Sequence, residues 1–170
     1  MKRAAMIIAP EKFRDEELFE PKEILEKAGI SVTVASTGLS PARGVKGGTI
    51  TPQARITELK ADDYDAVIFV GGGGASIYWD NPVAHALAGD AVKKGKLLAA
   101  ICIAPVTLAR AGVLTGRRAT VWPSEAEQLS AAGAHYTAQP VVKDGNIITG
   151  SGPNAAAEFG EEIKKALLVP

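Results

Sequence analysis

The sequence contains one cysteine, Cys102, in a setting typical of a catalytic nucleophile. It directly follows the apolar run 97–101, and the segment 104–111 after it has helical character. A nucleophile between a buried strand and a helix occupies the tight turn called a nucleophile elbow. Ala100 and Ala104, two positions on either side, are small, as that turn requires. A sulfur at a helix N-terminus also has a lowered pKa, which favours the thiolate. The alternative is a buried structural cysteine, which is common in proteins.

Four glycines at 71–74 follow a second apolar run, 66–70. They lack the lysine and the spacing of a phosphate-binding loop, and Ser76 stands where a dinucleotide-binding fingerprint needs its third glycine. Glycine backbone can approach a reacting oxygen closely. The N–H groups of Gly72 and Ile103 are therefore candidate donors of an oxyanion hole. A flexible turn is the alternative interpretation.

Composition and charge exclude several classes of protein. The 170 residues suggest one domain, 1–170, and the 19 basic and 19 acidic residues give no basic excess for nucleic acid. A single cysteine excludes an internal disulfide and a thiolate metal site, and we expect neither a metal nor a cofactor. The longest apolar stretch, 97–106, is about half of a membrane span. The first residues do not form a signal peptide, so we expect a cytoplasmic protein without membrane contact.

Apolar runs and helical periods alternate along the chain. We predict strands at 4–9, 31–36, 66–70, 97–101 and 119–122, a hairpin across 141–148, and helices at 15–28, 82–94, 104–111, 124–133 and after 153. The segment 37–52 is predicted to be a loop with a small hairpin. Such alternation predicts a mostly parallel sheet covered by helices on both faces. Ligands of such sheets bind at the carboxyl ends of the strands.

Individual residues predict where the helices begin and end. Gly29 is placed to end the first helix, and Asn81 to cap the helix that starts at the following proline. Ser124 and Glu127 have the spacing of a capping box. Pro21 is expected either to kink the first helix or to mark where its regular part starts.

Several motifs occur in an order and at intervals that resemble the ThiJ/PfpI family over nearly the whole chain. They are the segments 16–21, 63–72, 99–102, 111–114, 142–145 and 152–153. The resemblance implies a flavodoxin-like three-layer α/β sandwich and a homodimer, with hexamers in the protease branch. It makes Cys102 the reactive cysteine and Glu17 the acidic side chain that reaches the sulfur. Gly72 and Ile103 would supply backbone N–H groups, and Gly73 and Trp122 would form part of the pocket wall.

The sequence departs from the family pattern at three positions. Ile103 replaces the histidine that protease-like members place after the cysteine, Trp122 replaces a histidine of the parkinsonism-associated branch, and Ser151 replaces a common arginine. These changes argue against a Cys–His dyad. His85 and His135 are not expected to replace it. A late His-x-Glu pair, which amidotransferase relatives need, is also missing.

A mechanism without histidine requires Glu17 to be protonated, because a charged carboxylate would raise the thiol pKa. We therefore expect a neutral Glu17 beside a largely anionic Cys102. Such a pair can attack small reactive carbonyls, in a glyoxalase-like or deglycase-like reaction. The alternatives are an intracellular cysteine peptidase acting on peptides, and a redox-responsive or chaperone-like stress protein whose thiol oxidises.

Overall fold

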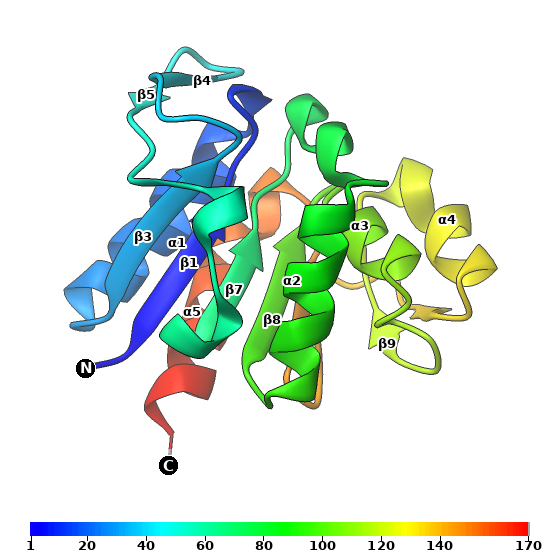
Figure 1. Ribbon diagram of the computed structural model, residues 1–170. Coiled ribbons are helices and arrows are strands. Elements are labelled where there is room, and N and C mark those ends of the chain that lie inside the picture. Colours follow the sequence, from blue (N-terminus) through cyan, green and yellow to red (C-terminus); the bar gives the residue numbers. More distant parts are fainter. Residues whose placement is uncertain (170) are drawn as a thin grey trace.

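The computed structural model describes residues 1–169 and contains a central seven-stranded sheet (Figure 1). The strand order is β11-β12-β8-β7-β1-β3-β6. The strands are β1 (Arg3–Ile7), β3 (Ser31–Ser36), β6 (Ala54–Arg55), β7 (Ala66–Phe69), β8 (Leu97–Ile101), β11 (Val141–Asp144) and β12 (Ile147–Gly150). Only the β11–β12 pair within this sheet is antiparallel, and the other pairs are parallel.

Helices cover both faces of this sheet (Figure 1). One face carries α1 (Asp15–Lys27) and α5 (Ala156–Leu168), which pack against each other. The other carries α2 (Pro82–Lys93) and α3 (Pro105–Arg110), with α4 (Ala126–Ala131) packed on α3. Short 3-10 helices occur at Ile56–Glu58, Ala61–Asp63, Gly73–Tyr78, Pro123–Glu125 and Pro153–Ala155. The predicted three-layer α/β sandwich with a mostly parallel sheet is confirmed.

The central strands β7 and β8 are apolar at every position, and β1 is apolar after Arg3, because both of their faces are covered. Successive side chains point to opposite faces, so Met6 and Ile68 join the core beneath α1 and α5. Their neighbours Ile7 and Phe69 join the core beneath α2 and α3. No helix within residues 1–169 has the length and apolar character needed to span a membrane.

A small three-stranded sheet stands beyond the carboxyl end of β1 (Figure 1). It consists of β2 (Glu11–Phe13), β4 (Ala42–Gly44) and β5 (Thr49–Ile50). The antiparallel β4–β5 pair is the hairpin expected within 37–52, whereas β2 was not predicted. A separate two-stranded sheet pairs β9 (Arg118–Ala119) with β10 (His135–Tyr136). The strand expected at 119–122 is therefore shorter and lies outside the main sheet.

Two predicted helix ends are confirmed. Gly29 has a φ of 82°, and the next N–H donates to the Leu25 carbonyl at 3.0 Å, which closes α1. The Asn81 side chain accepts the Ala84 N–H at 3.0 Å and caps α2.

One of the two alternatives for Pro21 and the predicted capping box were wrong. The helix α1 begins at Asp15 and contains Pro21, so Pro21 does not mark the start of its regular part. The capping box of Ser124 and Glu127 does not form, because Ser124 lies inside a 3-10 turn. Its hydroxyl donates instead to the carboxylate of Glu125 at 2.8 Å.

Candidate active site

The candidate site lies where three neighbouring parallel strands end. The strands β1, β7 and β8 are adjacent in the sheet, so their carboxyl ends lie side by side. The chain continues from β1 into β2, from β7 into the glycine run, and from β8 into Cys102. Because these strands are parallel neighbours, β2, the glycine run and Cys102 lie close together although they are far apart in the sequence.

Cys102 occupies a strained turn that the backbone holds in place. Its φ is 65°, a left-handed conformation that non-glycine residues rarely adopt. Its N–H donates to the Gly150 carbonyl at 2.9 Å, and its carbonyl accepts the Trp122 N–H at 2.8 Å. The next helix, α3, begins at Pro105. This is the expected strand–cysteine–helix elbow, and backbone strain of this kind is found most often at functional sites.

Glu17 reaches the elbow from the first turn of α1 and is fully buried at 0% exposure. Neither of its carboxyl oxygens has a hydrogen-bond partner of ordinary geometry within residues 1–169. The Cys102 thiol and the Gly71 N–H are nevertheless near enough to influence its pKa. A Cβ added at Gly71 would lie 2.5 Å from the Cys102 Cβ and would also overlap Glu17 Oε1. The structure therefore brings together the two residues that the sequence selected.

Burial dominates the ionisation of this pair. It raises the pKa of Glu17 to about 8, and the nearby Cys102 thiol lowers that pKa only in part. Burial, followed by the charge of Glu17, raises the pKa of the Cys102 thiol to about 12. A neutral Glu17 near pH 7 agrees with our expectation. The expectation of a largely anionic Cys102 was wrong, because desolvation outweighs the stabilising backbone groups.

Those backbone groups are the predicted ones. The N–H groups of Gly72 and Ile103 lie at the Cys102 sulfur and act to lower its pKa. Gly72 has a φ of 99°, and a Cβ there would lie 2.6 Å from the Lys12 carbonyl oxygen. Glycine at this position lets the turn after β7 approach both β2 and the cysteine. The amides are placed to donate to an oxygen bound next to the sulfur.

A pocket of about 690 Å³ opens over the sulfur. Its lining combines the elbow, the glycine turn and the small sheet: Glu11, Lys12, Arg14, Arg43, Gly44, Val45, Gly72, Gly73, Cys102, Ile103, Trp122 and Pro153. Gly73 and Trp122 line it, as predicted for its wall. Cys102 is 8% exposed, and its exposure is toward this pocket.

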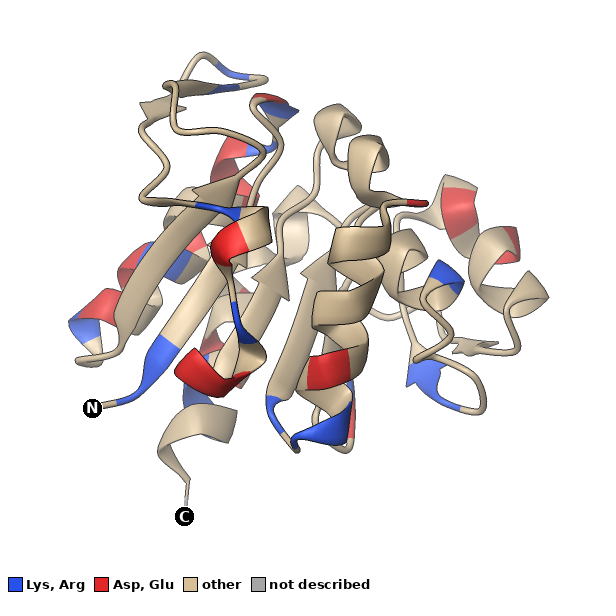
Figure 2. Ribbon diagram, viewed as in Figure 1, with Lys and Arg blue, Asp and Glu red and all other residues tan. Residues whose placement is uncertain are grey.

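The sequence did not reveal the basic residues of this lining, which are Lys12, Arg14 and Arg43. They come from β2, from the residue before α1, and from β4. In Figure 2, blue segments on β2 and β4 lie at the same end of the molecule. These residues come together because β2 pairs with β4. The spacing of residues along the sequence does not indicate that pairing.

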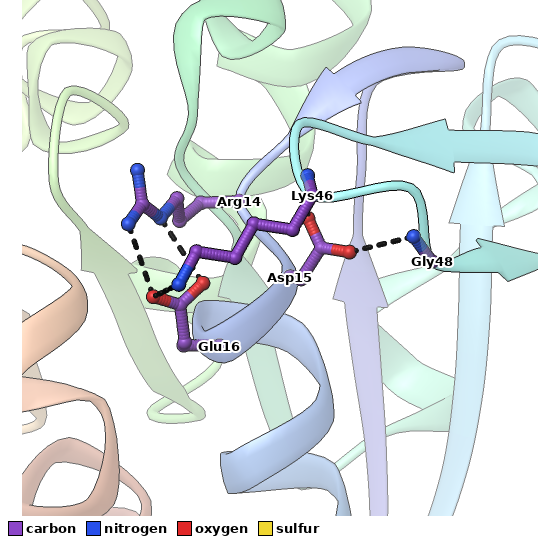
Figure 3. Close-up of polar contacts among 5 residues, drawn as sticks. All are labelled: Arg14, Asp15, Glu16, Lys46 and Gly48. Carbon is purple, nitrogen blue, oxygen red and sulfur yellow. Dashed lines mark hydrogen bonds and ion pairs between the residues drawn. The ribbon is translucent and has the colours of Figure 1, made fainter.

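A polar cluster joins the start of α1 to the turn after β4 (Figure 3). The Arg14 guanidinium donates to both oxygens of Glu16, at 3.1 and 3.0 Å. Lys46 approaches the same carboxylate at 3.2 Å. The hydrogen bond from Arg14 is the largest cause that lowers the pKa of Glu16 to about 2. Arg14 is thereby held beside the pocket in a defined orientation.

The side chain of Asp15 binds backbone N–H groups of the same turn. Its two carboxylate oxygens accept the N–H groups of Lys46 and Gly48, each at 2.8 Å (Figure 3). A Cβ added at Gly44 would lie 2.6 Å from the Asp15 Cγ, so glycine leaves room for this carboxylate. The helix that carries Glu17 therefore also positions the hairpin that covers the pocket.

Neither histidine lines the pocket. His85 Nε2 lies 2.7 Å from the Trp79 carbonyl oxygen, and the Trp79 indole N–H donates to the Ile103 carbonyl at 3.1 Å. His135 is an exposed residue of β10. No group of three or more His, Cys, Asp or Glu side chains within residues 1–169 is arranged to hold a metal ion.

Known proteins resemble this chain over nearly its whole length. The sequence profile of the DJ-1/PfpI family matches residues 2–166. The chain belongs to the DJ-1/PfpI family. It is 45% identical to an uncharacterized protein of Methanocaldococcus jannaschii over 168 residues, which cover 97% of this chain and 82% of that protein.

Two relatives within this DJ-1/PfpI family carry names of enzymes. The chain is 30% identical to the glutathione-independent glyoxalase DJR-1.2 of Caenorhabditis elegans, covering 99% of this chain and 90% of that protein. It is 32% identical to a deglycase of Pyrococcus abyssi, covering 95% and 98%. The crystal structure of a ThiJ/PfpI domain protein from Brachyspira murdochii superposes with a TM-score of 0.95 at 31% identity, covering 97% of this chain and 95% of that one.

Proposed function

We propose that this protein is a cofactor-independent, cysteine-dependent enzyme that converts small reactive carbonyl compounds in a glyoxalase-like or deglycase-like reaction. The observation that carries the proposal is the pairing of the Cys102 thiol with the buried Glu17 carboxyl group at the base of an open pocket. The glyoxalase and deglycase names of relatives that align over almost the whole chain support it.

The first step is addition of the thiol to an aldehyde. With a pKa of about 8, about a tenth of Glu17 is ionised near pH 7 and can accept the thiol proton as sulfur bonds to the carbonyl carbon. The same proton then passes to the aldehyde oxygen, which gives a neutral hemithioacetal. The N–H groups of Gly72 and Ile103 would stabilise the negative charge that develops on that oxygen.

The second step moves a proton between neighbouring carbons. For a 2-oxoaldehyde, the Glu17 carboxylate takes the proton from the former aldehyde carbon and returns it to the adjacent carbon. The hydroxyl proton moves at the same time from the former aldehyde oxygen to the former ketone oxygen. The hemithioacetal thereby becomes a thioester of a 2-hydroxy acid without a change in overall oxidation state. Water cleaves this thioester, releasing the hydroxy acid and restoring the thiol. A carboxyl group with a pKa near the working pH suits both directions of proton transfer.

The test measures formation of lactate from methylglyoxal by the purified wild type and two variants. Cys102→Ser and Glu17→Gln should each lower kcat/KM by at least about a hundredfold, since each removes a group that acts on the reacting atoms. Glu127→Gln, on the exposed surface of α4, is the matched control and should retain full activity. Equal turnover by wild type and Cys102→Ser would refute the proposal.

The same proteins discriminate the alternatives. A peptidase would release the fluorophore from an amidomethylcoumarin peptide, yet no histidine is placed to protonate a leaving amine. A redox-responsive protein would gain oxygen atoms at Cys102 in dilute peroxide without turning over methylglyoxal.

A further inference from the structure

We propose that the pocket contains an anion subsite, formed by Lys12 and Arg43, which selects carbonyl substrates that carry a carboxylate or phosphate group. This inference deepens the proposed function and rests on it for the identity of the reaction. Both residues line the same pocket as Cys102, and both are exposed. Neither takes part in an ion pair within residues 1–169, so both charges are available to a ligand.

The two cations are carried by one rigid unit. β2 and β4 pair with each other, the Arg43 N–H donates to the Pro10 carbonyl at 3.0 Å, and the Val45 N–H donates to the Phe13 carbonyl at 2.9 Å. Lys12 itself has a φ of 58°, a conformation unusual for lysine. The register of the β2–β4 pairing shifts between Glu11 and Phe13, which is where Lys12 takes this conformation.

The remaining charges at the pocket leave it positive, although the whole chain carries no net charge. Glu11 is the carboxylate among the lining residues. Arg14 adds a third positive charge, which Glu16 offsets only in part because that carboxylate is shared with Lys46. Glu17 is mostly neutral near pH 7. Clustered like charges in a concave, partly apolar surface attract ligands of the opposite sign.

The size of the pocket indicates where the anionic group of the ligand lies. A volume of about 690 Å³ is within the usual range for pockets that enclose much larger ligands than a three-carbon dicarbonyl. Trp122 and Val45 add exposed apolar surface to the lining. The geometry fits a substrate whose carbonyl meets Cys102 while a short carbon chain carries the anionic group to Lys12 and Arg43.

One test uses two alkylating reagents that differ in charge, iodoacetate and iodoacetamide. Intact mass gives the rate at which each modifies Cys102 at pH 8.5. Lys12→Met and Arg43→Met should each lower the iodoacetate-to-iodoacetamide rate ratio by about three- to fivefold, the scale of one partly exposed charge. Lys93→Met, an exposed lysine on α2, is the matched control and should leave the ratio unchanged. Every variant keeps Glu17, so the effect of its charge on the iodoacetate-to-iodoacetamide rate ratio is the same in all of them.

A second test compares substrates that share one reacting group. 4,5-Dioxopentanoate is a 2-oxoaldehyde with a terminal carboxylate, its methyl ester is the neutral counterpart, and phosphorylated hydroxypyruvaldehyde supplies the phosphate arm. Wild type should show a higher kcat/KM for the anionic substrates than for the ester. Lys12→Met and Arg43→Met should each lose that preference mainly through a higher KM for the anionic substrates. The substrate whose kcat/KM falls more, the carboxylate or the phosphate, carries the anionic group that the subsite prefers.

The two proposals fail in different ways. An unchanged alkylation ratio in both variants, with normal turnover of methylglyoxal, would overturn the anion subsite and leave the proposed function standing. A changed ratio without turnover of any dicarbonyl would support the subsite and reject the proposed function. If Lys12→Met does not fold, Lys12→Asn keeps the test valid, because asparagine tolerates a positive φ.

Discussion

Glu17 carries a carboxyl group into the protein interior, where ionisation costs more free energy than in water. Its pKa is about 8 in the folded protein and 4.5 is the ordinary value. Between these values the folded state retains a proton that the unfolded state has released. The folded protein should therefore lose stability as pH rises from about 4.5 to about 8, by a few kcal/mol. Glu17→Gln should remove this part of the pH dependence and be the more stable protein at pH 8.

Urea denaturation at pH 5 and pH 8 measures the effect as the difference in free energy of unfolding. Glu127→Gln removes an exposed carboxyl group and should leave the wild-type dependence intact. An identical pH dependence in wild type and Glu17→Gln would mean that Glu17 ionises normally in the folded protein.

The reactivity of Cys102 should depend on pH in a way that reflects its burial. Because its pKa is raised to about 12, the alkylation rate should still be increasing at pH 10. Glu17→Gln removes the repelling charge and should raise the rate at pH 9, while it lowers turnover. Rates with iodoacetamide across pH 7 to 10 test this. A plateau near pH 8 would show an ordinary or activated thiol.

At the residue level, sequence was sufficient to select Cys102 and Glu17, because small residues flank the elbow and the family motifs fix the acidic position. It was not sufficient to predict the ionisation of Cys102. The helix-terminus argument considers only neighbours along the chain, whereas desolvation depends on how the pocket and α1 enclose the sulfur. Arg43 was missed for a similar reason, since its place at the pocket depends on a pairing across about thirty residues.

The hairpin of β4 and β5 contributes part of the pocket lining above Cys102. The Asp15 side chain holds this hairpin to the start of α1. Asp15→Ala removes two hydrogen bonds of 2.8 Å from the Lys46 and Gly48 amides. We expect a loss of about 1–3 kcal/mol in local stability of the hairpin, the range for bonds to a charged group. Hydrogen exchange should accelerate at these amides, and KM for methylglyoxal should rise more than kcat falls.

Glu20→Ala, at an exposed position of the same helix, is the control for that substitution. It should change neither the exchange of the hairpin amides nor KM. Equal protection of the Lys46 amide in wild type and Asp15→Ala would show that the β2–β4 pairing holds the hairpin without Asp15.

At the level of elements, the buried strands were predictable because their apolar runs satisfy both faces of the sheet. The capped start of α2 was predictable because Asn81 acts on an amide three residues away. The capping prediction for Ser124 failed because Ser124 lies inside the 3-10 turn that begins at Pro123, where its hydroxyl donates to Glu125. The strand β2 is three residues long, too short for a periodic signal, and forms only because β4 pairs with it.

For the whole molecule, membership of the family leads us to predict a homodimer, with a hexamer as the alternative assembly. Large apolar side chains outside the pocket lining, among them Leu39, Ile77 and Val83, are exposed in the single chain and are candidates for such contacts. Light scattering coupled to size exclusion should give at least twice the 17.6 kDa of one chain. A mass of one chain at micromolar concentration would contradict this expectation.

The small sheet of β2, β4 and β5 stands apart from the layers that hold Cys102 and Glu17. The reacting groups thus lie in the sandwich, whereas the proposed contacts with the far end of a ligand come from the small sheet. Such a division allows the small sheet to diversify without disturbing bond-making atoms. Transplanting residues 11–13 together with residues 40–51 between members of the family would consequently be expected to exchange their preferences while each recipient keeps its own reaction.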